Sequence, residues 1–240
     1  MARRRFFVER IHSQAAELRG DEALHLTRVL RAEAGQLYEI SDNRNAYLAR
    51  IMEARGDRVT FQIVEPLADV VMPVRMTLCA ALVKFDAFEW TVEKATELGV
   101  MGILPVECAR SEKGLFEASA KRRDRWMRLA REASQQSRRT HLPEILPAVR
   151  FESAIGLEAT HRYLLEEDDA PPLLDSVPSE REAADHVAIL AGPEGGWTEE
   201  ERSRAAAAGW QPVSLGPLVL RAETASTAAL AVVVAAWLAV

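Results

Sequence analysis

The chain has 240 residues, 48% of them hydrophobic, which is enough for a core in one large or two small domains. It holds two cysteines and five histidines, without the spacing of a disulfide framework or a zinc site, so we expect no metal and a reducing, cytoplasmic compartment. The longest apolar run, residues 228–240, is shorter than the roughly 20 residues that span a bilayer, so we expect no membrane partner.

The net charge of −6 is unevenly distributed along the chain. Basic and acidic residues balance in 1–74, basic residues are in excess by four in 75–150, and acidic residues are in excess by ten in 151–240. A polyanion such as RNA can therefore bind one side of the molecule only. The basic residues gather in three places, namely Arg3, Arg4 and Arg5, then Arg28 and Arg31, then a run that includes Arg122 and Arg123.

Short alternating runs in the first 70 residues predict β-strands. They cover residues 36–40, 46–51 and 58–64, with turn-like segments between them. One helix is expected over residues 21–31. The pattern predicts a small antiparallel sheet or barrel in a first domain of residues 1–70, followed by a linker within 66–73.

From residue 74 the pattern changes to strands that alternate with helices, which predicts an α/β domain over residues 74–240. Its apolar strands indicate a mainly parallel, buried sheet. Strands are expected at 74–83, 102–106, 162–166, 187–191 and 212–215, and helices at 86–98, 119–137, 198–208 and over the final apolar run. The helix at 119–137 carries a large excess of basic residues, typical of phosphate contacts that give affinity without sequence specificity.

Two glycine-bearing loops near the end of the chain each follow a strand and precede a helix, where ligands bind in α/β sheets. The first loop is Gly192–Gly196 and the second starts at Leu215. The spacing of Thr198 and Glu201 predicts a helix-capping box, and the three glutamates of that turn would repel a phosphate. The glycine spacing also differs from that of nucleotide phosphate loops. We therefore expect a nucleoside without phosphate, with a plain strand–helix turn as the alternative.

Arg221 lies where the second loop meets the final helix, and two roles are open to it. It either pairs with Glu223 and fixes the loop, or faces a substrate phosphate or the edge of a base. The final helix is apolar on nearly every face, so it needs burial all round, which a dimer interface would supply.

Five short motifs occur in order along the chain and together indicate a family. They are His25-Leu26-Thr27-Arg28-Val29-Leu30-Arg31, Lys94–Val100, Arg110-Ser111, Gly192–Gly196, and Leu215-Gly216 with Val219–Ala225. In these motifs the chain resembles the bacterial 16S ribosomal RNA uridine-N3-methyltransferases, the RsmE group of the SPOUT superfamily. The resemblance implies a PUA-like RNA-binding β-barrel at residues 1–70. It also implies a SPOUT-type α/β methyltransferase domain with a trefoil knot at residues 74–240, and a homodimer.

The resemblance further implies S-adenosyl-L-methionine (SAM) as cofactor and one uridine of 16S rRNA in the 30S ribosomal subunit as substrate. Cofactor binding is then expected at Leu165, Glu166, Leu190, Gly192, Pro193, Glu194, Gly195, Gly196, Leu215, Gly216, Leu220, Thr224 and Ala225. RNA contacts are expected from Arg3, Arg4, Arg5, Arg28, Arg31, Arg122 and Arg123. The catalytic hypothesis is that Arg221 stabilises negative charge on the uracil oxygens and Glu223 orients Arg221.

Two other classes of function are weighed against this one. A non-catalytic, ribosome-associated RNA-binding protein with the SPOUT fold is disfavoured by the intact Arg221-x-Glu223-Thr224 segment and the complete first loop. A nucleotide-dependent metabolic enzyme with a doubly wound sheet is disfavoured by the missing phosphate fingerprint and by the uneven charge.

Overall fold

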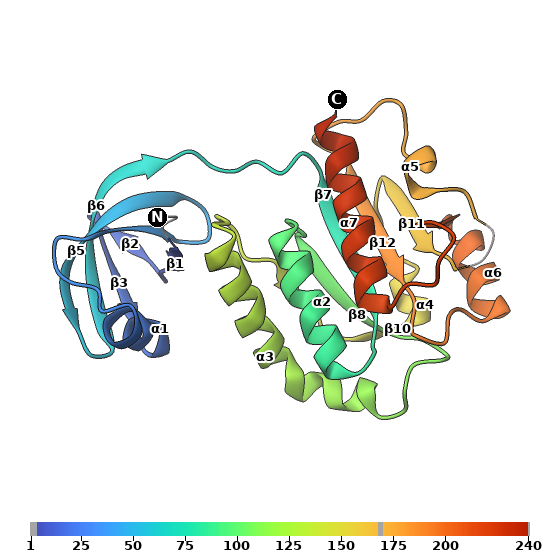
Figure 1. The fold of residues 1–240 in the computed structure, drawn as a ribbon, viewed down its shortest axis with the longest axis horizontal. Coiled ribbons are helices and arrows are strands. Elements are labelled where there is room, and N and C mark those ends of the chain that lie inside the picture. Colours follow the sequence, from blue (N-terminus) through green and yellow to red (C-terminus); the bar gives the residue numbers. More distant parts are fainter. Residues whose placement is uncertain (1–3, 168–169, 240) are drawn as a thin grey trace. The chain divides into compact units, whose positions relative to one another are not determined.

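The computed structural model describes residues 4–167 and 170–239, and the chain divides into two compact units (Figure 1). The N-terminal unit contains the described part of Met1–Val71 together with Arg131–Leu142. The C-terminal unit contains Met72–Ala130 and the described part of Pro143–Val240. The change of unit after Val71 falls within the predicted linker, but the sequence pattern gave no sign that residues 131–142 belong with the first unit.

A six-stranded sheet in the order β1-β4-β5-β6-β3-β2 forms the N-terminal unit. Neighbouring strands in this sheet are antiparallel, except that β1 runs parallel to β4. The strands are β1 (Arg5–Phe7), β2 (Ile11–His12), β3 (Ala15–Arg19), β4 (Leu37–Ser41), β5 (Ala46–Arg55) and β6 (Arg58–Leu67). The three predicted strands are confirmed as β4, β5 and β6. Strands β1, β2 and β3 were not predicted, because they are short and lack a clear alternation of apolar and polar residues.

The predicted helix over 21–31 is present in two parts. A single α-helical turn, α1 (Asp21–Leu24), continues as a π-helical turn, η1 (His25–Val29). Leu26 of η1 is fully buried in the core of this unit, together with Phe6 and Ile40 from the sheet. The change from α to π geometry was not foreseen, because helix propensity and periodicity do not distinguish the two.

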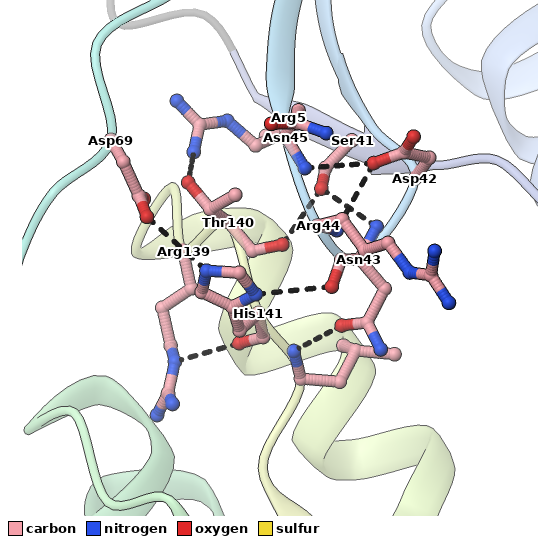
Figure 2. A network of polar contacts seen from close by, with 11 residues as sticks. Arg5, Ser41, Asp42, Asn43, Arg44, Asn45, Asp69, Arg139, Thr140 and His141 are labelled. Atoms are coloured by element: carbon pink, nitrogen blue, oxygen red, sulfur yellow. Dashed lines mark hydrogen bonds and ion pairs between the residues drawn. The ribbon is translucent and has the colours of Figure 1, made fainter. Parts of the chain in front are cut away.

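Polar contacts explain why Arg131–Leu142 belongs to the N-terminal unit (Figure 2). The carbonyl oxygen of Thr140 accepts a hydrogen bond from Ser41 Oγ at 2.7 Å, and Thr140 Oγ1 accepts one from Arg5 Nη1 at 2.9 Å. The backbone N–H of Leu142 donates to Asn43 Oδ1 at 2.7 Å. These bonds fasten the segment to the ends of β1 and β4.

The C-terminal unit contains a seven-stranded sheet in which every described pair of neighbours is parallel. The order is β10-β8-β7-β12-β11-β13, with β9 beside β8. The strands are β7 (Arg75–Ala81), β8 (Gly102–Glu107), β9 (Glu144–Ile145), β10 (Val149–Arg150), β11 (His161–Leu165), β12 (His186–Ala191) and β13 (Gln211–Val213). The helices are α2 (Phe85–Glu97), α3 (Leu115–Gln136), α4 (Phe151–Ala154), α5 (Leu173–Ser176), α6 (Glu199–Ala207) and α7 (Ala222–Leu238). The predicted mainly parallel, buried sheet is confirmed.

Helices cover both faces of this sheet. Because side chains alternate along a strand, Ile189 of β12 joins one core, with Phe88 of α2 and Val233 of α7, while Leu190 joins the other, with Ala205 of α6. Helices α2 and α7 lie side by side on the first face (Figure 1). The carboxyl ends of the parallel strands are thereby left for the loops that carry the site.

Helix α7 confirms the predicted apolar helix at the end of the chain. Leu230, Val233 and Trp237 are buried in the C-terminal unit, whereas Leu238 is 66% exposed. Within the described residues, none of the helices combines the length and the apolarity needed to cross a bilayer.

Candidate cofactor site

The two glycine loops lie together at the carboxyl ends of β11, β12 and β13, where they line a cavity that opens to solvent. Of the residues predicted to bind the cofactor, the lining contains Leu165, Glu166, Gly192, Pro193, Gly196, Leu215, Gly216, Leu220 and Ala225. Four other predicted residues, Leu190, Glu194, Gly195 and Thr224, are not part of the lining. The lining also contains five residues that were not predicted, namely Glu167, Trp197, Arg202, Leu218 and Ala222.

Trp197 ties the first loop to the neighbouring strand. Its indole Nε1 donates to the carbonyl oxygen of Leu165, at the end of β11, at 2.8 Å, and its side chain is buried. A Cβ on Gly192 would lie only 2.9 Å from Cε2 of the Trp197 ring, so a larger residue at position 192 would displace the ring. The sequence signal for this bracing role was a tryptophan directly after the glycine loop that follows a buried strand.

The predicted capping box at the start of α6 is confirmed. Thr198 Oγ1 accepts from the backbone N–H of Glu201 at 3.2 Å, and Glu201 Oε2 accepts from the backbone N–H of Thr198 at 2.9 Å. Glu201 Oε1 also accepts from the backbone N–H of Ala109 at 2.8 Å. The helix N-terminus is thus occupied by a carboxylate and offers no site to a phosphate.

Arg110, from the loop between β8 and α3, holds the other side of the first glycine loop. Its Nη1 donates to the carbonyl oxygen of Gly195 at 2.7 Å and to that of Trp197 at 3.2 Å. A Cβ on Gly195 would lie 3.2 Å from Arg110 Cβ, so the backbone approaches closely here. Gly195 therefore shapes the loop without facing the cavity.

The acidic residues after β11 differ in their environments. Glu166, predicted to contact the cofactor, accepts from Arg202 Nε at 3.0 and 3.2 Å, and only 6% of its side chain is exposed. Its carboxylate is therefore already engaged by Arg202, while its place in the cavity lining leaves cofactor binding by Glu166 a prediction. Glu167 is exposed, lines the cavity and forms no ion pair among the described residues, so it is the carboxylate available to a ligand.

Arg221 is the N-cap residue of α7, and its side chain is exposed. Its neighbours Leu220 and Ala222 both line the cavity, which places Arg221 at the rim. Glu223 lies in the first turn of α7, and the described residues show no ion pair between it and Arg221. The interpretation in which Arg221 only braces the loop through Glu223 therefore has no contact to support it.

The sequence signature of the RNA methyltransferase domain family matches residues 71–234. This chain belongs to that family. It is 34% identical over 214 residues to "Ribosomal RNA small subunit methyltransferase E" of Synechocystis sp., over 86% of this chain and 68% of the relative. It is 27% identical over 243 residues to the Bacillus subtilis protein of the same name, over 95% of each chain.

Solved structures of related methyltransferases share the whole fold. A Legionella pneumophila protein, solved in complex with SAM, covers 98% of each chain with a TM-score of 0.89 and 27% identity. Ribosomal RNA small subunit methyltransferase E from Neisseria gonorrhoeae, bound to SAM, covers 95% of each chain with a TM-score of 0.85 and 30% identity.

The arginines predicted to bind RNA in this RNA methyltransferase fall into different environments. Arg5 is 2% exposed, and its guanidinium is bonded to Glu39 at 3.0 Å as well as to Thr140. It therefore stabilises the N-terminal unit and is not available to RNA, which corrects the prediction. Arg3 lies outside the described residues. Arg4 Nη1 lies 3.2 Å from Nε2 of His25, the first residue of η1.

The remaining arginines divide in the same way. Arg28 and Arg31 are exposed at the end of η1. On α3, Arg122 lies over the Phe85 ring at 4.8 Å and 3.5 Å from Glu89, and Arg123 Nε donates to the Ile145 carbonyl oxygen at 2.9 Å. Arg122 and Arg123 are thus partly engaged within the C-terminal unit, which leaves Arg28 and Arg31 better placed for a partner.

The two cysteines are neutral, buried thiols. Burial raises the pKa of Cys79 to about 12, and burial together with the charge of Glu201 raises that of Cys108 well above its usual value. Neither thiol can act as a nucleophile in the family's reaction. The described residues contain no group of three or more His, Cys, Asp or Glu side chains that could hold a metal ion.

Proposed function

We propose that the chain is a SAM-dependent enzyme that methylates N3 of one uridine in the 16S rRNA of the small ribosomal subunit. The observation that carries the proposal is the cavity between the two glycine loops, in a chain of the RNA methyltransferase family. Relatives with the same fold bind SAM. Relatives at 34% and 27% identity are named as small-subunit rRNA methyltransferases.

The cavity suits a nucleoside with a positively charged substituent. Leu165, Leu215 and Leu220 supply apolar surface for an adenine ring, and the two loops supply backbone N–H and C=O groups for its edge. The acidic turn of α6 disfavours a phosphate, as described above. Glu167 supplies a negative charge for the amino group or the hydroxyls of the ligand. Residues Gly192, Pro193, Gly196, Gly216 and Ala225 complete the proposed contacts.

SAM, when bound, supplies an electrophilic methyl group on a cationic sulfur atom. N3 of uridine carries a proton at neutral pH, so the chain must stabilise the negative charge that appears when this proton passes to solvent water. Arg221, at the rim of the cavity and without an ion pair among the described residues, is placed to donate to the uracil oxygens. Glu223 would orient Arg221 once the base is present, and the walls of the cavity would align N3 with the methyl group.

The finer features of the fold are proposed as well. We infer a PUA-like RNA-binding barrel from the six-stranded sheet of the N-terminal unit. We infer a trefoil knot of the SPOUT type in residues 74–240, where β11 lies between β12 and β13 and α7 then returns to pack on β7 and β12. Ala231, Ala235 and Leu238 of α7 are all exposed and apolar, which supports a homodimer, and the substrate implies the cytoplasm.

A non-catalytic RNA-binding protein with the same fold is the alternative. The formed cavity and the exposed Arg221 at its rim argue against it, because neither is needed for binding RNA alone. Incubation of the purified chain with radiolabelled SAM and 30S subunits from a strain without its gene separates the two functions. We expect label in N3-methyluridine, identified by nucleoside mass spectrometry. RNA binding and SAM binding without any transferred label would favour the alternative.

A further inference from the structure

The end of η1 presents two adjacent apolar side chains to solvent. Val29 is 64% exposed and Leu30 is 40% exposed, whereas Leu26 of the same turn is fully buried. Single exposed apolar residues are common on protein surfaces, but here two lie side by side on one turn. Because π-helical turns occur frequently at functional sites, the pair calls for a binding role.

The backbone at this place is held in an unusual conformation. Arg31 has a φ of 50°, in the left-handed region that glycine enters at no steric cost. The backbone N–H of Leu30 donates to the carbonyl oxygen of His25 at 3.1 Å, and that of Ala32 donates to the carbonyl oxygen of Leu26 at 3.0 Å. These bonds fix the turn and hold the exposed side chain of Arg31 in place on it.

The apolar pair lies between two positive charges. Arg28 and Arg31 are both exposed, and within the described part of the chain neither forms an ion pair. Arg4 is bonded to His25 at the start of η1, which brings a third guanidinium to the same turn. The acidic residue that follows most closely along the chain is Glu33. The surface therefore complements a polyanion that also offers an apolar face.

We propose that this tip, residues Arg28–Arg31, binds an unpaired base of the RNA substrate. Val29 and Leu30 pack against the face of the base, and Arg28 and Arg31 contact the phosphates on either side of it. The inference rests on the proposed rRNA methylation and adds what the N-terminal unit recognises. A duplex hides the faces of its bases in the stack, so the tip selects a loop, a bulge or a single strand.

The size of the apolar surface favours RNA over a protein partner. A stable protein–protein interface buries about 800 Å² on each partner. Two adjacent side chains offer much less than this area, but they match the face of a single base. Apolar side chains that pack against bases, with arginine on the backbone, are a recurring way of binding nucleic acid.

The test uses the full-length chain with a single-stranded RNA of about 12 nucleotides, within the range of common site sizes, and the duplex of the same sequence. For the double variant Val29→Ser/Leu30→Ser we expect affinity for the single strand to fall roughly 5- to 20-fold, the loss of one base contact. Its affinity for the duplex should not change. Val64→Ser, which alters an apolar residue 46% exposed on β6, serves as the matched control and should bind like the wild type.

Salt dependence separates the apolar and the charged contacts. Arg28→Ala and Arg31→Gly should each reduce the slope of log affinity against log salt by about 1, because one phosphate contact is lost. The double serine variant should leave this slope unchanged. Arg31→Gly should also keep the melting temperature of the wild type, since glycine adopts the required φ freely, so weaker binding would not reflect unfolding.

Three results would overturn the inference. The first is wild-type affinity of the double serine variant for the single strand, and the second is an equal loss of affinity for single strand and duplex. A change in molar mass by light scattering with unchanged RNA affinity would also overturn it, because the tip would then bind another copy of the chain. SAM titration and methylation assays on the wild type distinguish a failure of this inference from a failure of the proposed function. If those assays fail while the RNA results hold, the proposed catalytic function is wrong and the proposed base binding by Arg28–Arg31 is still supported.

Discussion

The guanidinium of Arg110 donates to the carbonyl oxygen of Gly195 at 2.7 Å, across 85 residues of sequence. The same Nη1 atom reaches the carbonyl oxygen of Trp197, so one side chain holds two points of the first glycine loop. On the other side of that loop, Trp197 Nε1 donates to the carbonyl oxygen of Leu165, and the Trp197 ring lies close to Gly192. The loop is therefore formed in the free chain, which lowers the entropy cost of binding a ligand.

Arg110→Lys should weaken SAM binding about tenfold, because the lysine nitrogen lies one bond nearer the backbone than Nη1 and falls short of the Gly195 and Trp197 carbonyl oxygens. Hydrogen bonds from charged groups contribute about 1.5–3 kcal/mol each. Isothermal titration calorimetry measures the Kd. Arg204→Lys, which alters an arginine on α6 that pairs with Glu152 and Glu200, is the matched control and should keep the wild-type Kd. An unchanged Kd in Arg110→Lys would remove the positioning role of Arg110.

Gly192→Ala should lower both stability and SAM affinity, because the new Cβ would lie 2.9 Å from the buried ring of Trp197. Forcing extra volume into packed surroundings costs about 1–3 kcal/mol. Thermal unfolding and SAM titration measure the two effects. Gly156→Ala is the control, since its Cβ would meet only an ordinary contact at 3.5 Å, and it should match the wild type in both. Tight SAM binding by Gly192→Ala would show that the ring can move without consequence.

Glu166 and Glu167 should respond differently to the same change. Glu166→Gln removes the charge that pairs with Arg202, which is itself partly exposed, so we expect a loss of about 1–2 kcal/mol in stability, between the values for surface and buried pairs. Glu167→Gln removes the free carboxylate at the cavity and should leave stability unchanged but raise the Kd for SAM several-fold. Denaturant unfolding and calorimetry on both variants separate these outcomes. A loss of stability in Glu167→Gln, together with a raised Kd for SAM and unchanged stability in Glu166→Gln, would contradict the assignment of Glu167 as the free carboxylate.

His186 should make stability depend on pH. Burial, and then the charge of Arg75, lower the pKa of His186, whose Nε2 lies 2.9 Å from Thr77 Oγ1. As the pH is lowered below about 6.5, the unfolded chain therefore binds a proton at a higher pH than the folded chain does. The free energy of unfolding then falls by less than 1.4 kcal/mol for each unit by which the pH is lowered. Urea unfolding at several pH values should show this slope reduced in His186→Gln. His12→Gln, which alters an exposed histidine on β2, should leave it unchanged.

Local patterns predicted much of the fold. The apolar runs at residues 187–191 and 102–106 become β12 and β8, because a strand buried on both faces needs continuous apolar residues. The capping box of Thr198 and Glu201 was predictable because its partners are three residues apart. The two glycine loops were predicted to form one site because both follow parallel strands.

Features that depend on distant partners could not be predicted. The bond between Arg110 and Gly195 joins two loops far apart in sequence, and nothing in either loop identifies the other. Arg5 looks like a basic residue for RNA until the structure places Glu39 and Thr140 around it. In the same way, the sequence could not distinguish Glu166 from Glu167, because the difference is made by Arg202 on α6.

Nucleoside mass spectrometry of 16S rRNA from a strain without the gene tests the central claim most directly. The account predicts that N3-methyluridine is lost in that strain and returns when the wild-type chain is supplied. It should not return with Arg221→Ala, although that variant still binds SAM. A normal level of N3-methyluridine in the strain without the gene would contradict the account.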